Sequence, residues 1–429
     1  MEAGLRLILS ALFVILSCTA TLANNATFTY LRTMSVEELN VILDTERAKF
    51  LATSKPGDGY VLPPVARAAN AVDLYTVRYS SSRPELGRKP VPVSGLLAIP
   101  VVPAQSGVPL LAYQHGTVWW KYQVPSYAFK PKNPTGYPHY DGSYETRFMV
   151  GMFAGNGYAV MASDYIGMGD GARENEAYTI KGTSAQASYD LDEDVRRYLV
   201  KRSLPVSHVF LGGWSQGGLN TTGLLEFMEA KGVDVSGAFT AASPNDPLAL
   251  MNGLLYHPRT IDASWINTLV ALTAFSCEKY YGPKGLAKQV IDPRYFKAFK
   301  SIYERTYAGE AALFALLQQW EGIPLQEFFS PRYRDPSFFA NSAYGKCLAN
   351  GETYRQQFKA DVRMYYGTVD EVVRDKVARL AGMYQDALAT DKTLSDTSQI
   401  SLFEIIGGDH RLTFVSAAAA SKIWMDAFQ

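Results

Sequence analysis

Short, unbroken runs of apolar residues recur along the chain from residue 91 onward. Such a run predicts a strand that is covered on both faces, because neighbouring side chains of a strand point to opposite sides of the sheet. Helical stretches separate the runs, and this alternation favours a mainly parallel sheet with helices on both faces. The predicted strands lie at residues 93–99, 108–114, 158–163, 209–212, 237–242, 362–366 and 402–406.

Other parts of the chain carry helical or alternating patterns. Ser35 to Glu38 reads Ser-Val-Glu-Glu, a capping box that predicts a helix running through Leu39 and Leu43. Residues 72–77 alternate between apolar and polar, which predicts a half-buried strand. Residues 190–202 place apolar side chains on one helical face, which predicts an amphipathic helix with one buried stripe.

The alternation of strands and helices stops near Pro247 and resumes at Val362. The intervening block is helical and aromatic, with predicted helices at 265–275, 295–307 and 310–320. We interpret it as a helical cap inserted over the mouth of the sheet, so that the expected fold class is α/β with a capped, mainly parallel sheet. The predicted division is a signal peptide at 1–23, a helix and strand extension at 24–90, a first core part at 91–246, the cap at 247–355 and a second core part at 356–429.

The first residues have the pattern of an export signal. Arg6 precedes an apolar run from Leu7 to Leu16, and small residues follow as far as Ala23. The alternative is a lipoprotein signal that anchors the protein through Cys18. No later run reaches the roughly 20 apolar residues of a membrane-spanning helix, so we expect a secreted or periplasmic protein without a stable membrane span.

Charge and composition narrow the function classes. The 429 residues contain 41 Lys and Arg and 41 Asp and Glu, so no net positive field exists to attract a nucleic acid. Metal-ligand clusters, phosphate-binding loops and dinucleotide fingerprints are absent from the sequence, and we expect no cofactor. The length favours one large catalytic domain with insertions.

After removal of the signal, two cysteines remain, Cys277 and Cys347. An even number of cysteines in an oxidising compartment favours a disulfide between them. The alternative is a pair of buried free thiols.

A possible nucleophile lies in Gly213 to Gly217, which reads Gly-Trp-Ser-Gln-Gly. The pattern alone is weak, but it follows a short apolar strand and precedes a helical stretch. This context is that of a nucleophile elbow, in which glycines allow a sharp turn that exposes the hydroxyl of Ser215.

A serine hydroxyl needs a base, which is usually a histidine held by a carboxylate. Of the five histidines, only His257 and His410 follow Ser215 in the chain, as the order of this type of site requires. His257 lies in the cap, whereas His410 follows the last predicted strand on a glycine-rich loop. We therefore predict His410 as the base.

Asp370 is the predicted acid, because it follows the preceding strand of the sheet and is itself followed by a helix. Glu371 is its neighbour and is expected to point elsewhere. Asp246 is the reserve candidate, and Asp409 is interpreted as a loop residue.

Acyl transfer also requires N–H donors for the developing oxyanion. The residue after the nucleophile, Gln216, supplies one. The strand ending in His115 and Gly116 turns its amides inward, and we predict Thr117 N–H as the second donor. His115 is then interpreted as a residue that orients this loop rather than as the base.

Taken together, these motifs resemble the secreted α/β-hydrolases related to the secretory lipases. The resemblance covers about residues 91–246 and 360–415, and it implies an α/β-hydrolase fold with a helical cap and a Ser-Asp-His carboxylester hydrolase. It rests on Tyr113–Thr117, Val124–Ser126, Ser163–Asp170, the elbow, and the loops of Asp370 and His410.

The expected function is an exported serine esterase or lipase that acts on a small-molecule or lipid ester. A secreted peptidase or amidase could use the same triad, and a hydrolase-like binding protein without catalysis is the third alternative. Aromatic residues of the cap either bind an acyl chain or only pack the cap against the core; they are Trp265, Phe275, Phe314 and Trp320.

Overall fold

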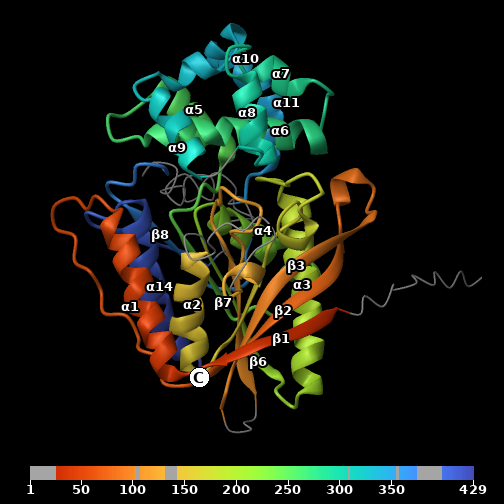
Figure 1. Cartoon of the computed structure of the whole chain (residues 1–429), viewed down its shortest axis with the longest axis vertical. Coiled ribbons are helices and arrows are strands. Elements are labelled where there is room, and N and C mark those ends of the chain that lie inside the picture. The colour runs from red at the N-terminus through yellow and green to blue at the C-terminus, as the bar shows by residue number, and fades with distance from the viewer. Residues whose placement is uncertain (1–25, 103–106, 131–142, 308–309, 354–356, 374–398) are drawn as a thin grey trace, which may run out of the picture.

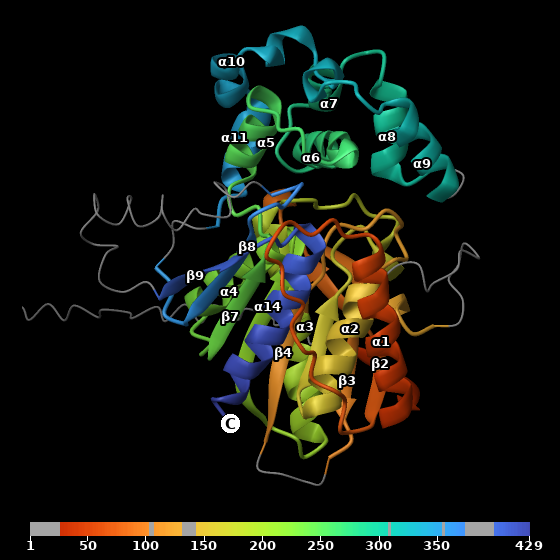
Figure 2. The same ribbon diagram turned by 90° about the vertical axis from the view of Figure 1, so that its left-hand side faces the viewer.

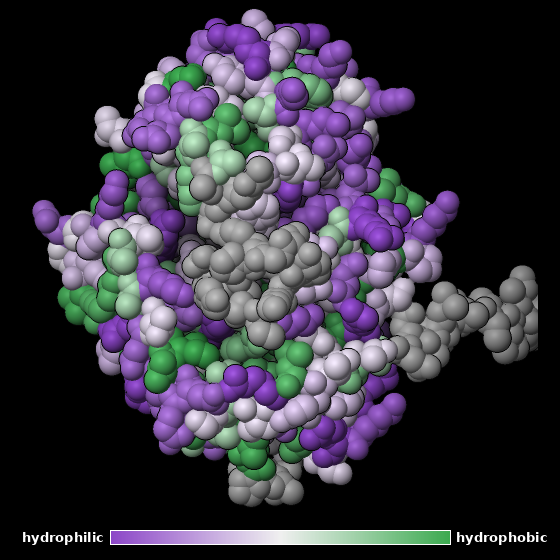
Figure 3. All heavy atoms as spheres, in the orientation of Figure 1, coloured by the Kyte–Doolittle hydropathy of each residue, from purple (hydrophilic) through white to green (hydrophobic). Residues whose placement is uncertain are grey.

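The computed structural model describes residues 26–102, 107–130, 143–307, 310–353, 357–373 and 399–429. The predicted signal peptide and Cys18 lie outside these ranges. Among the described residues, no helix is both long and apolar enough to cross a membrane. In the view of Figure 3, hydrophilic side chains are interspersed with smaller hydrophobic groups on the surface.

The described strands form one nine-stranded sheet in the order β1-β2-β3-β5-β4-β6-β7-β8-β9. From β5 to β9 along this order, every neighbouring pair is parallel, whereas β1, β2 and β3 are antiparallel to their neighbours. The strands are β1 Thr27–Met34, β2 Val72–Ser82, β3 Pro90–Pro100, β4 Val108–Gln114, β5 Ala159–Ser163, β6 Val206–Trp214, β7 Gly237–Ala241, β8 Val362–Gly367 and β9 Ile400–Ile405.

Two features of the sheet differ from the sequence pattern. The apolar run at 93–99 belongs to β3, which is antiparallel to both of its neighbours. Its side chains enter hydrophobic cores on both faces, so the run reflects burial of the two faces and not the direction of the strand. Strand β1 was not predicted, because as an edge strand it is mostly exposed and lacks a continuous apolar pattern.

Helices cover both faces of the sheet (Figures 1 and 2). On one face, α1 (Val36–Ala52), α2 (Tyr144–Phe153) and α14 (His410–Asp426) share a core with the strands. On the other face lie α3 (Lys181–Lys201) and α4 (Gln216–Ala230). The predicted capping box begins α1: Ser35 Oγ accepts a hydrogen bond from Glu38 N, and the Glu38 carboxylate accepts one from Ser35 N.

The chain between β7 and β8 forms the helical cap. Figures 1 and 2 show its helices stacked beyond one end of the sheet. The cap helices share a hydrophobic cluster that includes Val270, Phe299, Phe328 and Tyr344, and Tyr178 and Ile180 below the cap join it. The mainly parallel sheet, the helices on both faces and this cap confirm the predicted fold class. The cap helices are α5 Pro247–Tyr256, α6 Asn267–Tyr280, α7 Leu286–Val290, α8 Phe296–Glu304, α9 Glu310–Gln319, α10 Pro336–Asn341 and α11 Ala343–Asn350.

A disulfide joins Cys277 of α6 to Cys347 of α11 within the cap, which confirms the predicted pairing. The bond closes a loop with a sequence separation of 70 residues. Chain entropy for such a loop corresponds to about 4 kcal/mol of stability. We expect a Cys277→Ser, Cys347→Ser double variant to lose up to about this amount, measured by urea unfolding against the oxidised wild type. Two alkylatable thiols in the oxidised, denatured wild type would contradict the pairing.

Candidate active site

Ser215, Asp370 and His410 all follow parallel strands at the same edge of the sheet. Ser215 lies between β6 and α4, Asp370 follows β8, and His410 is the first residue of α14 after β9. Ser215, His410 and Thr117 line one cavity of about 770 Å³ between the core and the cap. The structure therefore brings the predicted nucleophile and base to the same space.

The turn at Ser215 has the geometry of a nucleophile elbow. Ser215 has φ 56° and ψ −123°, a conformation that is strained for a residue with a side chain. A Cβ atom at Gly213 would lie 2.2 Å from the carbonyl oxygen of Gly217, and one at Gly217 would lie 2.0 Å from that of Gln114. Both glycines of the motif are thus required for the tight approach of β4, β6 and α4.

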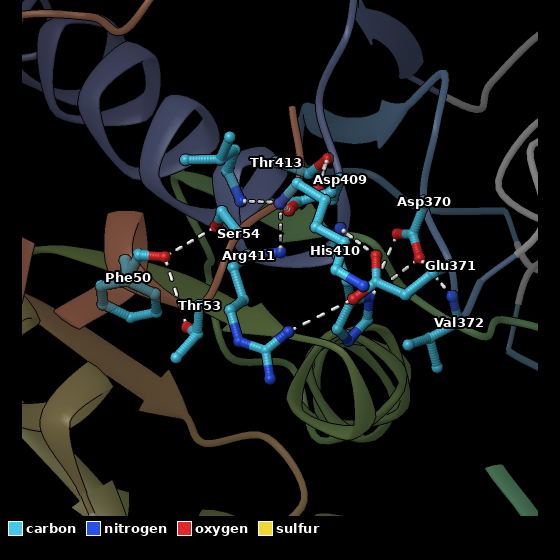
Figure 4. A network of polar contacts seen from close by, with 12 residues as sticks. Phe50, Thr53, Ser54, Asp370, Glu371, Val372, Asp409, His410, Arg411 and Thr413 are labelled. Carbon is cyan, nitrogen blue, oxygen red and sulfur yellow. Dashed lines mark hydrogen bonds and ion pairs between the residues drawn. The ribbon is translucent and has the colours of Figure 1, made fainter. Parts of the chain in front are cut away.

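His410 and Asp370 form a buried pair (Figure 4). The Nδ1 atom of His410 lies 3.0 Å from Asp370 Oδ2 and 3.1 Å from Oδ1. Asp370 is 1% exposed, and its Oδ1 also accepts hydrogen bonds from the backbone N–H groups of Val372 and Val373. Because a carboxylate only accepts, Nδ1 carries the hydrogen, and Nε2 is left as the proton acceptor.

Opposing effects set the pKa of His410. Burial alone lowers it, but the charge of Asp370 and the hydrogen bond to it raise it, as does the charge of Glu371. The net effect is a pKa above the ordinary value of 6.5. His410 therefore becomes a neutral base only above that pH.

Further contacts fix the position of His410. Glu371, which we expected to point elsewhere, accepts the His410 backbone N–H at 3.0 Å and binds Arg411 at 3.2 Å (Figure 4). Trp214 donates its indole N–H to the His410 carbonyl at 2.9 Å, and the two rings lie 5.2 Å apart. Sequence reasoning missed both roles, because Trp214 occupies the variable position of the motif and Glu371 lies beside the stronger candidate.

The other acidic and histidine candidates have different surroundings. Asp246 caps α5 and accepts the N–H of Ala249, and Asp409 caps α14 and accepts the N–H of Leu412. His257 is exposed at the end of α5.

The turn after β4 places Thr117 at the cavity. Gly116 N–H donates to Glu145 Oε1 at 2.9 Å, so this amide is already engaged. His115 Nδ1 donates to the carbonyl oxygen of Gly116 at 2.7 Å. Since the peptide is planar, fixing that carbonyl also fixes the direction of the Thr117 N–H. Gln216 is the first residue of α4, where backbone N–H groups lack helical acceptors.

His115 is buried, and burial lowers its pKa to about 4. It is therefore neutral, and its ring stacks on Tyr165 with centroids 4.3 Å apart. Tyr165 also donates its hydroxyl to the His115 carbonyl at 3.0 Å. These contacts support the interpretation of His115 as a residue that orients the turn.

The aromatic residues of the cap divide into two groups. Trp265 and Phe314 line the cavity, where Trp265 meets Trp119 edge to face at 5.8 Å. Phe275 and Trp320 pack inside the cap, against Tyr303 and Phe328 among others. Among the residues that the structure describes, no group of three or more His, Cys, Asp or Glu side chains is placed to hold a metal ion.

No protein-family model and no curated protein sequence matches the chain. Solved structures do match it. The rice cell wall degrading esterase LipA from Xanthomonas oryzae superposes with a TM-score of 0.72 at 19% identity, over 94% of this chain and 98% of that one. Candida antarctica lipase A superposes with a TM-score of 0.59 at 15% identity, over 89% and 77% of the two chains. The chain therefore has the α/β-hydrolase fold of these esterase and lipase structures.

Proposed function

We propose that the protein is an exported serine hydrolase that cleaves carboxylic esters through Ser215, His410 and Asp370. The observation that carries the proposal is the His410–Asp370 pair, whose histidine lines the same cavity as the strained Ser215. The fold shared with named esterases and lipases supports it. The export pattern of residues 1–23 and the disulfide between Cys277 and Cys347 support a secreted or periplasmic location.

The reaction follows from the roles of the three side chains. Ser215 Oγ attacks the ester carbonyl carbon while its proton passes to His410 Nε2, and Asp370 stabilises the resulting imidazolium. The N–H groups of Gln216 and Thr117 stabilise the oxyanion. The imidazolium then protonates the departing alcohol, leaving an acyl-enzyme. Water attacks this intermediate with His410 as base, which releases the acid and restores Ser215.

A panel of p-nitrophenyl esters of increasing acyl length, assayed beside peptide p-nitroanilides, tests the reaction class. We expect hydrolysis of the esters to exceed that of the anilides. Preferential cleavage of the anilides would instead identify a peptidase or amidase with the same triad. Since one structural neighbour is named a rice cell wall degrading esterase, esters extracted from plant cell walls belong in the panel.

The cavity wall provides a prediction about substrate preference. Phe314 is 55% exposed and lines the cavity, so we expect Phe314→Ala to cost little stability. The variant should lose part of the apolar contact between this ring and a long acyl chain, which corresponds to about 1.5 kcal/mol of binding free energy. We therefore expect kcat/KM for an octanoyl ester to fall by about tenfold relative to that for an acetyl ester.

Phe275→Ala is the matched control, since Phe275 is 5% exposed and packs within the cap. It should lower the free energy of unfolding by about 3 to 5 kcal/mol without changing the preference for acyl length. An unchanged preference in Phe314→Ala, or an equal shift in both variants, would contradict a direct contact between Phe314 and the acyl chain.

A further inference from the structure

A buried carboxyl group lies at the edge of the candidate active site without a role in the triad. It belongs to Glu145, the second residue of α2, which is 5% exposed. Glu145 lines the same cavity as Ser215, His410 and Thr117. A carboxyl group so far removed from water requires hydrogen-bond partners, and its partners indicate what it does.

Both oxygens of Glu145 bind β4 and the turn that follows it. Oε1 accepts the backbone N–H of Gly116 at 2.9 Å, and Oε2 accepts the hydroxyl of Tyr113 at 2.7 Å. Gly116 immediately precedes Thr117, the proposed oxyanion donor. Glu145 and His115 therefore hold the N–H and the carbonyl of the same residue, and together they orient the peptide that carries the Thr117 N–H.

Burial and the surrounding groups set the pKa of Glu145. Burial raises its pKa to about 7, while the bonds from Tyr113 and Gly116 and the charge of His410 lower it. The neighbouring ionisable groups come from several elements; they are Tyr113, Tyr165 and Tyr144, with His410, Arg411 and Lys49 on the cavity wall. Glu145 therefore ionises only near neutral pH, above the ordinary range of a glutamate carboxyl group.

We propose that Glu145 is a positioning residue for ester hydrolysis, which fixes the turn that carries the oxyanion donor Thr117 N–H. The proposal rests on the proposed function of Ser215. As a carboxylate, Glu145 accepts both hydrogen bonds. Once it is protonated, one oxygen carries a hydrogen, and the hydrogen bond from Gly116 N–H is no longer made to a charged acceptor, so it becomes weaker. Protonation of Glu145 is therefore expected to slow the reaction.

The pH profile of kcat/KM provides the test. In the wild type, His410 must be neutral and Glu145 ionised, and both pKa values lie above their ordinary values. Activity should therefore fall on the acid side with a slope steeper than one. Glu145→Gln cannot ionise, so only His410 titrates on the acid side, and its neutral amide holds Gly116 N–H less strongly than a carboxylate does. Its acid limb should have a slope of one and shift to lower pH, and its plateau kcat should be about 10- to 100-fold lower.

Tyr113→Phe provides a second, opposite prediction. It removes a hydrogen bond that lowers the pKa of Glu145, so the acid limb should move to higher pH. Glu46→Gln is the structural control, because Glu46 of α1 forms a buried ion pair, with atoms 2.6 Å apart, with Arg147, which lies on α2 as Glu145 does. It should lower thermal stability without changing the slope of the acid limb.

The outcomes separate the two proposals. A Glu145→Gln profile with the slope, midpoint and plateau of the wild type would overturn the role of Glu145 while leaving the esterase proposal intact. If the acid limb of Tyr113→Phe had the same midpoint as that of the wild type, this result would also contradict the role of Glu145. The test therefore holds even if Glu145→Gln fails to fold. If the wild type neither hydrolysed esters nor reacted with a phosphonate at Ser215, both proposals would fall.

Discussion

Ser215→Ala is expected to reduce kcat for ester hydrolysis by about 10⁶-fold, because loss of a serine nucleophile removes the covalent route entirely. Alanine retains the Cβ atom, so the strained backbone conformation at residue 215, with φ 56°, costs about the same in the variant. The fold should therefore be preserved. The measurement is steady-state hydrolysis of a p-nitrophenyl ester, with circular dichroism to confirm folding. Residual activity above about one part in a thousand of the wild type would point to a different nucleophile.

Ser416→Ala is the matched control for that variant. Ser416 is a buried serine on α14 that pairs with the hydroxyl of Tyr60 at 3.2 Å and is not among the residues that line the cavity. Its loss should leave kcat within about twofold of the wild type, since a surface or core hydroxyl outside the site affects stability rather than chemistry.

Asp370→Asn is expected to lower kcat by about 10⁴-fold if the behaviour of serine proteases applies. The amide retains an oxygen that can accept from Val372 and Val373, so the loop should keep its shape. Its NH₂ group can donate to His410 Nδ1, which favours the tautomer with the hydrogen on Nε2. That tautomer cannot accept the Ser215 proton. The measurement is kcat at a pH on the plateau of the wild-type profile.

Asp246→Asn is the matched control, because it makes the same change at the carboxylate that was the reserve candidate for the acid. Asp246 caps α5, and asparagine is about as good an N-cap as aspartate, so activity and stability should change little. A large loss of kcat in Asp246→Asn together with a small one in Asp370→Asn would show that the acid had been assigned to the wrong strand.

The sequence indicated much of the fold and the triad candidates because these depend on local patterns. Gly213 and Gly217 flank Ser215 in a strand-to-helix turn, and the structure shows the close backbone contacts that exclude other residues there. His410 was selected by chain order after Ser215, and it lies beside Asp370 as that order predicts.

Other parts of the site depend on contacts between segments that no local pattern connects. Glu145 accepts a hydrogen bond from Gly116, which lies 29 residues away in the sequence. Trp214 donates one to His410, which lies 196 residues away. Each of these side chains would be an ordinary core residue if read from its own helix or strand. For the same reason, the sequence could not distinguish cap residues that line the cavity from those that pack inside the cap. Phe314 and Phe275 both lie in apolar helical stretches, but Phe314 is exposed and Phe275 is buried.

Reaction with a p-nitrophenyl alkylphosphonate most directly tests the central claim that Ser215 is the nucleophile of an ester hydrolase. The serine displaces p-nitrophenolate and remains bound to phosphorus, so the reaction both counts and locates the nucleophile. The account predicts one p-nitrophenolate released per chain, an added mass on the peptide that contains Ser215, and a parallel loss of ester hydrolysis. Full ester hydrolysis by protein modified at Ser215, or modification confined to another residue, would contradict it.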